Sequence, residues 1–173
     1  MISYFALVLL FSGCDLIKDA STITIPTDLK ADIPVVVISK KSNDLAGAVS
    51  AASFTKTQDL TLASNADIQP YLAKLKEINL NSLVVTVTGL TGTQTINSVS
   101  LDVAGVGNIF TQTNITMTNN SFTPVISAAT LDLVAAKLFN DKKITLTVSG
   151  NASGPMSFTV GLNFDADVVA TVL

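Results

Sequence analysis

The sequence is most informative in what it lacks. It contains no histidine and no tryptophan, and all ten of its basic residues are lysines, so arginine is absent as well. Without histidine, the commonest general base and metal ligand is missing. Without arginine, there is no bidentate group for phosphate or carboxylate. These absences argue against an enzyme, and we expect neither a cofactor nor a resident metal.

Charge is also scarce. Charged residues make up 13% of the chain, against about 25% in a typical globular protein. The net charge is −3, which leaves no basic surface for nucleic acid. Threonine and serine take the place of the missing charges, with 21 and 16 residues. Threonine is β-branched and suits the exposed face of a sheet, so this composition predicts a mainly β protein.

The first residues form an apolar run that is too short to span a membrane. Residues 2–13 are almost wholly apolar, but Asp15, Lys18 and Asp19 follow at once. A membrane-spanning helix needs about 20 apolar residues, whereas the apolar region of a secretory signal peptide has about 7–15. The pattern predicts a signal peptide over residues 1–13.

The only cysteine stands directly after this run. The segment Leu10-Phe11-Ser12-Gly13-Cys14 resembles the bacterial lipobox, although Phe11 stands where leucine is usual. The resemblance implies that Cys14 is lipidated, that cleavage occurs before it, and that residues 14–29 form a lipid-anchored tether. Within residues 15–32 we expect the tether to lead into a first strand. The alternative is an ordinary cleaved leader with an incidental cysteine.

The rest of the chain reads as one domain over residues 30–173. We expect a single antiparallel β-sandwich, immunoglobulin-like in style, with about seven to nine strands. Glycine-containing segments at 89–92 and 150–155 predict two hairpin turns. The expected strands cover residues 33–39, 46–62, 80–88, 93–103, 108–118, 144–149 and 156–172.

Two segments have the helical period instead. Residues 67–78 place Ile68, Leu72, Leu75 and Ile78 on one stripe, with Pro70 in the first turn. Residues 128–139 also have an apolar stripe at helical spacing. Ser127 directly precedes them and is a candidate N-terminal cap. We therefore predict two short helices near residues 67–78 and 128–139. The second stripe consists of Leu131, Val134, Ala135 and Leu138.

Short segments recur in the same order in both halves of the domain. Residues 53–55, 73–75 and 85–89 resemble residues 121–123, 136–138 and 146–150, at offsets of 61 to 68 positions. The matches indicate either an internal duplication or the chance similarity of a threonine-rich β chain.

The last predicted strand carries the most site-like residues. Asn163, Asp165 and Asp167 would share one face, opposite an apolar face that begins at Leu162. An oxygen-rich row is a weak candidate for a Ca²⁺ site, because calcium needs six to eight oxygens around one point. The alternative is a solvated face whose partners are Lys142 and Lys143.

The overall pattern resembles small uncharacterised envelope lipoproteins of the Bacteroidota. The resemblance implies a membrane-anchored protein of the cell envelope with a non-catalytic binding or structural domain, and with envelope proteins or glycans as partners. One alternative is an apolar ligand in a groove inside the sandwich, because the chain has a mean hydropathy of +0.53. A second alternative is a calcium-dependent surface adhesin.

Overall fold

The computed structural model describes residues 21–38 and 52–172. Within these residues, eight strands, two short 3₁₀ helices and one α-helix follow one another. Their bounds are β1 Thr22–Val37, β2 Ala52–Thr61, η1 Leu62–Ser64, η2 Gln69–Lys74, β3 Leu75–Thr88, β4 Ile96–Val103, β5 Gly107–Ile115, β6 Ser121–Phe122, α1 Ala128–Asp141, β7 Lys143–Ala152 and β8 Met156–Thr171.

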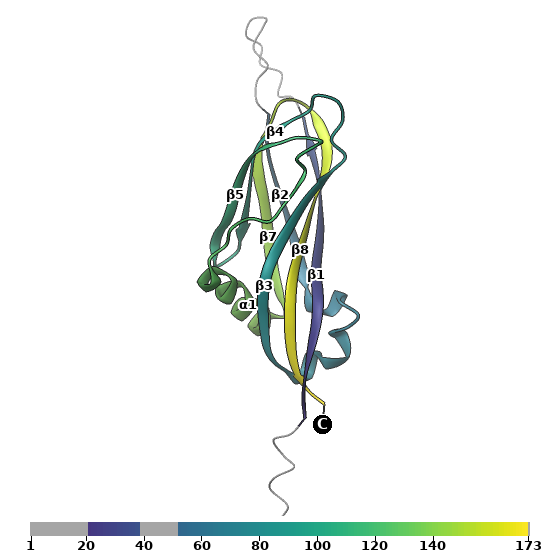
Figure 1. Ribbon diagram of the computed structural model, residues 1–173, viewed down its shortest axis with the longest axis vertical. Helices are drawn as coiled ribbons and strands as arrows, with labels where there is room; N and C mark the ends of the chain where they lie inside the picture. Colours follow the sequence, from purple (N-terminus) through teal and green to yellow (C-terminus); the bar gives the residue numbers. More distant parts are fainter. Residues whose placement is uncertain (1–20, 39–51, 173) are drawn as a thin grey trace, which may run out of the picture.

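The strands form two four-stranded antiparallel sheets that face each other (Figure 1). Sheet A has the order β1-β8-β3-β6, and sheet B has the order β2-β7-β4-β5. This arrangement confirms the predicted β-sandwich. We call the end that carries Thr22, Thr171 and η2 the lower pole, and the end that carries residues 89–95 and 153–155 the upper pole (Figure 1).

Strand β8 lies between β1 and β3 in sheet A. All sixteen residues of β1 pair with it on one side, and β3 pairs with it on the other. Its sequence alternates strictly, so that Leu162, Phe164, Ala166 and Val168 are at most 1% exposed. The predicted two-faced strand is therefore confirmed.

The first strand begins earlier than the predicted domain boundary. Residues 22–29, which were assigned to the tether, lie in β1 and pair with β8. Every second residue of β1 from Thr27 onward is buried, which is the pattern of a strand with one face on the core. The strand expected within residues 15–32 is therefore present from Thr22 onward, and it continues without a break to Val37.

The helix predicted over residues 67–78 is present only as a shorter 3₁₀ helix, η2, and its second half is wrong. A 3₁₀ helix ends at Lys74, and β3 begins at Leu75. Pro70 lies in the first turn of η2, where its missing N–H costs nothing. Bulges between Leu75 and Glu77 and between Leu80 and Ser82 shift the alternation of β3, so its buried residues mimic helical spacing.

The second predicted helix is confirmed as α1. Ser127 caps it, since its hydroxyl oxygen accepts a hydrogen bond from the Thr130 N–H at 3.1 Å. The predicted apolar stripe is the buried face, which packs on β3 and β7.

Neither predicted hairpin is a hairpin. The chain passes from sheet A to sheet B between β3 and β4, and back to sheet A between β7 and β8. A hairpin joins β4 to β5 instead, through residues 104–106. Glycine marks all three connections, and local sequence does not distinguish a turn within a sheet from a crossing between sheets.

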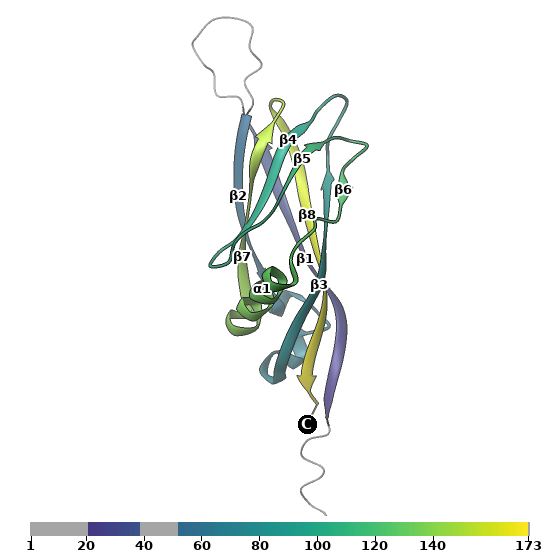
Figure 2. The same ribbon diagram turned by 60° about the vertical axis from the view of Figure 1, so that its left-hand side comes forward.

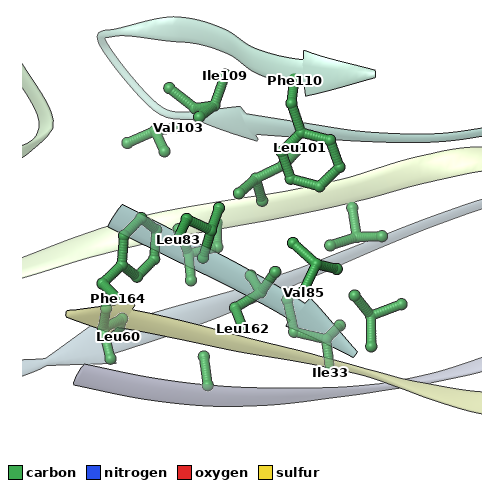
Figure 3. Close-up of a cluster of buried hydrophobic side chains, with 14 of the residues drawn as sticks. Ile33, Leu60, Leu83, Val85, Leu101, Val103, Ile109, Phe110, Leu162 and Phe164 are labelled. Atoms are coloured by element: carbon green, nitrogen blue, oxygen red, sulfur yellow. The ribbon is translucent and has the colours of Figure 1, made fainter. Parts of the chain in front are cut away.

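The core between the sheets is filled by aliphatic and aromatic side chains (Figure 3). Two edge-to-face phenylalanine pairs join the sheets. The ring centroids of Phe54 and Phe158 lie 5.2 Å apart, and those of Phe110 and Phe122 lie 5.8 Å apart. Strand β6 pairs with the edge of β3 at Val85 and Thr86, and α1 lies nearer the lower pole against β3 and β7, as Figure 2 shows.

The edge strands carry features that disfavour pairing with another sheet. Strand β1 contains Pro26 and Pro34, which have no N–H to donate. Strand β2 carries Lys56 two residues after the buried Phe54, so that by alternation its position faces the core side of the sheet. The Lys56 side chain is nevertheless exposed, and β2 is the edge strand of sheet B. A charge that points inward on an edge strand obstructs the approach of a second strand.

Gly150 offers a test of how closely the strands of sheet B pack. A Cβ atom at this position would lie 2.0 Å from the Ser98 carbonyl oxygen and 2.8 Å from Phe54 Cζ. We expect Gly150→Ala to lower the free energy of unfolding by about 3 kcal/mol or more, because backbone on β4 would have to move. Urea denaturation measures the change.

The matched control is Gly154→Ala, where a Cβ atom would meet nothing within 4 Å. This control should stay within about 0.5 kcal/mol of the parent chain. Equal denaturation midpoints for the two variants would contradict the packing described.

Candidate functional site

The predicted site residues lie on the outer face of sheet A, in the middle strand β8. In the pairing register, Asn163 stands between Lys30 and Val84, and Asp165 stands between Asp28 and Ser82. The row therefore has both polar and apolar neighbours on the two adjacent strands.

Each of the three predicted residues has different surroundings. The Asp167 carboxylate accepts a hydrogen bond from Asn81 Nδ2 at 3.1 Å. Asp165 is exposed. The Oδ1 atom of Asn163 is buried and has no hydrogen-bond partner within the described part of the chain. The side chains thus share a face, as predicted, but do not converge on one point.

The lysines predicted as partners lie elsewhere. Lys143 forms an ion pair with Asp59 at 3.3 Å on sheet B. The ammonium group of Lys142 lies 4.2 Å from the centre of the Phe139 ring and donates to the Phe139 carbonyl. That prediction is wrong, because Lys142 caps the end of α1 and Lys143 begins β7, which belongs to sheet B.

A polar groove follows the free edge of β1 near the lower pole. One hollow of about 480 Å³ adjoins a second of about 250 Å³, and both involve Asp28, Lys30 and Asp67. Asp165 reaches the larger hollow, so one predicted residue belongs to the groove. Lys30 forms an ion pair with Asp28 at 3.2 Å.

Asn65 builds this groove by fixing the segment after η1 to β1. Its Nδ2 group donates to Thr27 Oγ1 and to the Asp28 carbonyl, both at 3.0 Å. Its Oδ1 atom accepts from the N–H groups of Asp67 and Ile68, at 2.9 and 3.2 Å. One side chain thus closes the local turn and joins it to the sheet.

Thr27 is the buried polar member of the same network. It is 9% exposed, and its hydroxyl donates to the Asp67 carboxylate at 3.2 Å. Sequence reasoning missed Thr27 and Asn65 and placed Asp67 at the start of a predicted helix. The only local signal was the Ser-Asn-Ala-Asp run at 64–67, which is typical of a turn but does not reveal its distant partner.

The groove does not have the geometry of a calcium site. Within residues 21–38 and 52–172, no group of three or more His, Cys, Asp or Glu side chains lies close enough to hold a metal ion. Calcium needs six to eight oxygens at about 2.3–2.6 Å, and the face of a strand delivers its oxygens in a row.

A third hollow lies between β3 and α1 and has a volume of about 280 Å³. Ile78 and Phe139 contribute apolar surface, and Lys76, Glu77 and Asp132 contribute charge. None of the three hollows described has a mainly apolar lining, which gives no support to a lipid groove there.

One carboxylate has a clearly shifted pKa. Hydrogen bonds from Thr145 Oγ1, at 2.6 Å, and from Lys143 hold the pKa of Asp59 below its ordinary value. All three side chains lie on the outer face of sheet B, where solvent screens their charges. Surface pairing explains the shift without any catalytic role.

Cys14, the predicted lipidation site, lies outside the described residues. No helix in the part of the chain that the structure describes is long and apolar enough to cross a membrane.

Comparisons with known proteins add little to this geometry. No protein-family model matches the chain, and no curated protein matches it in sequence. Among solved structures, a chain from Desmodium yellow mottle tymovirus is similar over 86% of this chain and 90% of its own length. The identity is 11% and the TM-score 0.30, so this similarity carries no argument about fold or function.

Replacing Asn65 tests the role of this side chain. Asn65→Ala removes two hydrogen bonds that join the turn to β1 and two that close the turn itself, and we expect a loss of about 1–3 kcal/mol in the free energy of unfolding. In the control Asn151→Ala, the amide makes one long contact of 3.4 Å to Ser98 Oγ, and little should change. Equal effects of the two substitutions on thermal denaturation would contradict the proposed role.

The pKa of Asp59 predicts a pH dependence. A lowered pKa in the folded state stabilises the fold above the unfolded value of about 3.9, and this contribution is lost as the pH falls through the folded pKa. Asp59→Asn should therefore lower Tm slightly at pH 7, and the difference should vanish in strong acid. Thr145→Val should act in the same direction. A difference that stayed constant with pH would refute this explanation.

Proposed function

We propose that this chain is a lipid-anchored protein of the bacterial cell envelope, whose β-sandwich is a non-catalytic binding or structural module. The lipobox-like segment that ends at Cys14 supports the anchor. Two acyl chains on a cysteine hold a protein stably on a bilayer, because each buried CH₂ group contributes about 0.8 kcal/mol.

The observation that carries this proposal is the position of Thr22, where β1 begins. Residues 15–21 separate Cys14 from the first paired residue of the sandwich. Because a chain extends by at most about 3.6 Å per residue, Thr22 would lie within roughly 30 Å of the lipidated residue. A lipid at Cys14 would therefore be joined to the folded domain by a short connection, which would keep the domain close to the membrane.

This connection gives the domain an orientation. Thr22 lies at the lower pole, where the Val172 N–H donates to the Ser21 carbonyl at 2.8 Å (Figure 1). In the proposed arrangement the lower pole faces the membrane. The upper pole, with residues 89–95 and 153–155, faces away and is the surface offered to partners such as envelope proteins or glycans.

The support for a non-catalytic role comes from composition. The chain has no histidine to serve a serine nucleophile and no arginine to hold an oxyanion or a phosphate.

Metabolic labelling tests the anchor. In a bacterial host that lipidates such proteins, the parent chain should incorporate radioactive palmitate and fractionate with membranes. Cys14→Ser should abolish both, whereas Ser12→Ala keeps a small residue before the cleavage site and should retain them. Equal labelling of the parent chain and Cys14→Ser would overturn the proposal.

Thiol accessibility tests the orientation. In the lipidated protein, a cysteine introduced at Ala73 or at Thr93 would be the only free thiol, and both positions are exposed. On liposomes, a bulky maleimide should react more slowly at position 73, near the lower pole, than at position 93. The leaderless chain 21–172 should lose this difference. Equal rates on the liposome would contradict the orientation.

A further inference from the structure

We propose that the sandwich consists of two copies of one four-strand unit, related by an approximate two-fold axis along the strands. The first unit is β2-β3-β4-β5. The second is β6-β7-β8-β1, so that its last strand stands first in the chain. The natural chain is then a circular permutation of a simple tandem duplication.

The sheet orders support this relation. Replacing each strand of sheet A by its counterpart converts β1-β8-β3-β6 into β5-β4-β7-β2, which is the order of sheet B. All three neighbour relations are preserved at once. The helical elements agree as well, because η2 leads directly into β3, and α1 leads into its counterpart β7.

Two glycines occupy equivalent places in the two units. Gly150 lies near the end of β7, and a Cβ atom there would clash with the carbonyl oxygen of Ser98 on β4. A Cβ atom at Gly89, after β3, would lie 3.4 Å from the carbonyl oxygen of Ser157 on β8, the counterpart of β4. Each glycine thus lies against a serine carbonyl near the start of the strand that follows the crossing.

The pairing register repeats with the same offsets. Gly150 follows Gly89 by 61 positions, and Ser157 follows Ser98 by 59. Applied to the β4–β7 pair Leu101 and Val148, these offsets give Val160 and Val87. That pair is observed between β8 and β3. The next core pair also agrees, since Val103–Leu146 corresponds to Leu162–Val85.

The recurring sequence segments fall on the strands that the symmetry equates. Residues 53–55 lie in β2, and residues 121–123 begin in its counterpart β6. Residues 85–89 end β3, and residues 146–150 lie in β7. The match between residues 85–89 and 146–150 also keeps the pairing register, whereas Phe122 pairs with Val85 and so corresponds by register to Gln58 rather than to Phe54. The units differ in length: β6 pairs over two residues, whereas β2 pairs over ten.

The first and last described strands meet where the second unit lacks a turn. Residues 104–106 join β4 to β5 in a hairpin. The equivalent strands β8 and β1 pair up to Thr171 and Thr22, and Val172 donates to Ser21 just beyond them. Strands β8 and β1 are therefore paired like the two strands of a hairpin, but no turn joins them.

This permutation has a consequence that rests on the proposed function. Without it the chain would begin with β2, whose first residue, Ala52, lies toward the upper pole (Figure 1). Because β1 leads instead, a lipid at Cys14 is connected to the lower pole. The rearranged strand order determines which end of the duplicated sandwich faces the membrane.

A permuted chain tests the inference. We join Val172 to Ser21 through Asn-Gly, the preferred two-residue hairpin turn, and open the chain between Gly105 and Val106. If the units are equivalent, the product has the natural topology with the two units exchanged. We expect cooperative thermal unfolding, native-like circular dichroism and a Tm within about 10 °C of the linear chain 21–172. A chain that fails to fold cooperatively overturns the inference.

Closing the junction without opening the chain elsewhere gives an independent test. The circular chain with the same Asn-Gly connection should have a higher Tm than the linear chain, because closure removes entropy from the unfolded state. A lower Tm would show that β8 and β1 do not meet as a hairpin and would also overturn the inference. Neither result depends on palmitate labelling, so failure of the anchor proposal is separately detectable.

Discussion

The structure depends on the pairing of its first strand with its last. Strand β8 lies between β1 and β3 and forms backbone hydrogen bonds to both along most of its length. These ladders bring residues 22–37 beside residues 156–171. Sheet A can therefore form completely only after residues 156–171 have been synthesised. Loop entropy opposes such distant pairing, and the apolar faces of the two strands supply the compensating burial. Both proposals, the anchored lower pole and the permuted duplication, follow from where this pair ends.

Local sequence predicted elements whose pattern is undisturbed. The stripe of α1 and the alternation of β8 each repeat without interruption, and both were identified correctly. The pattern failed at the start of β3, where the bulge between Leu75 and Glu77 places Leu75 and Ile78 at a helix-like spacing. It failed again at the two predicted hairpins, because Gly150 serves for close approach to β4, and the positive φ of Gly89 turns the chain toward the other sheet rather than back along its own.

The candidate site was predictable only in part, for a related reason. The common face of Asn163, Asp165 and Asp167 follows from the period of a strand, and the structure confirms it. The edge groove does not follow from sequence, because Asn65 contacts Thr27 and the Asp28 backbone across about forty intervening residues. A short polar turn gives no indication of which distant strand it will bind. The same limit explains why Lys143 was assigned to the wrong carboxylates.

The central claim is that β1 is an integral strand of the sandwich rather than an appended segment. Native-state hydrogen exchange of the chain 21–172 tests it most directly. The hydrogen-bonded amides of β1 and β8 should belong to the same slowest class and open with the free energy of global unfolding. If the amides of β1 exchanged far faster than those of β8, as one unit of their own, the strand would detach while the rest stayed folded. That result would contradict both the two-unit architecture and the direct connection from anchor to domain.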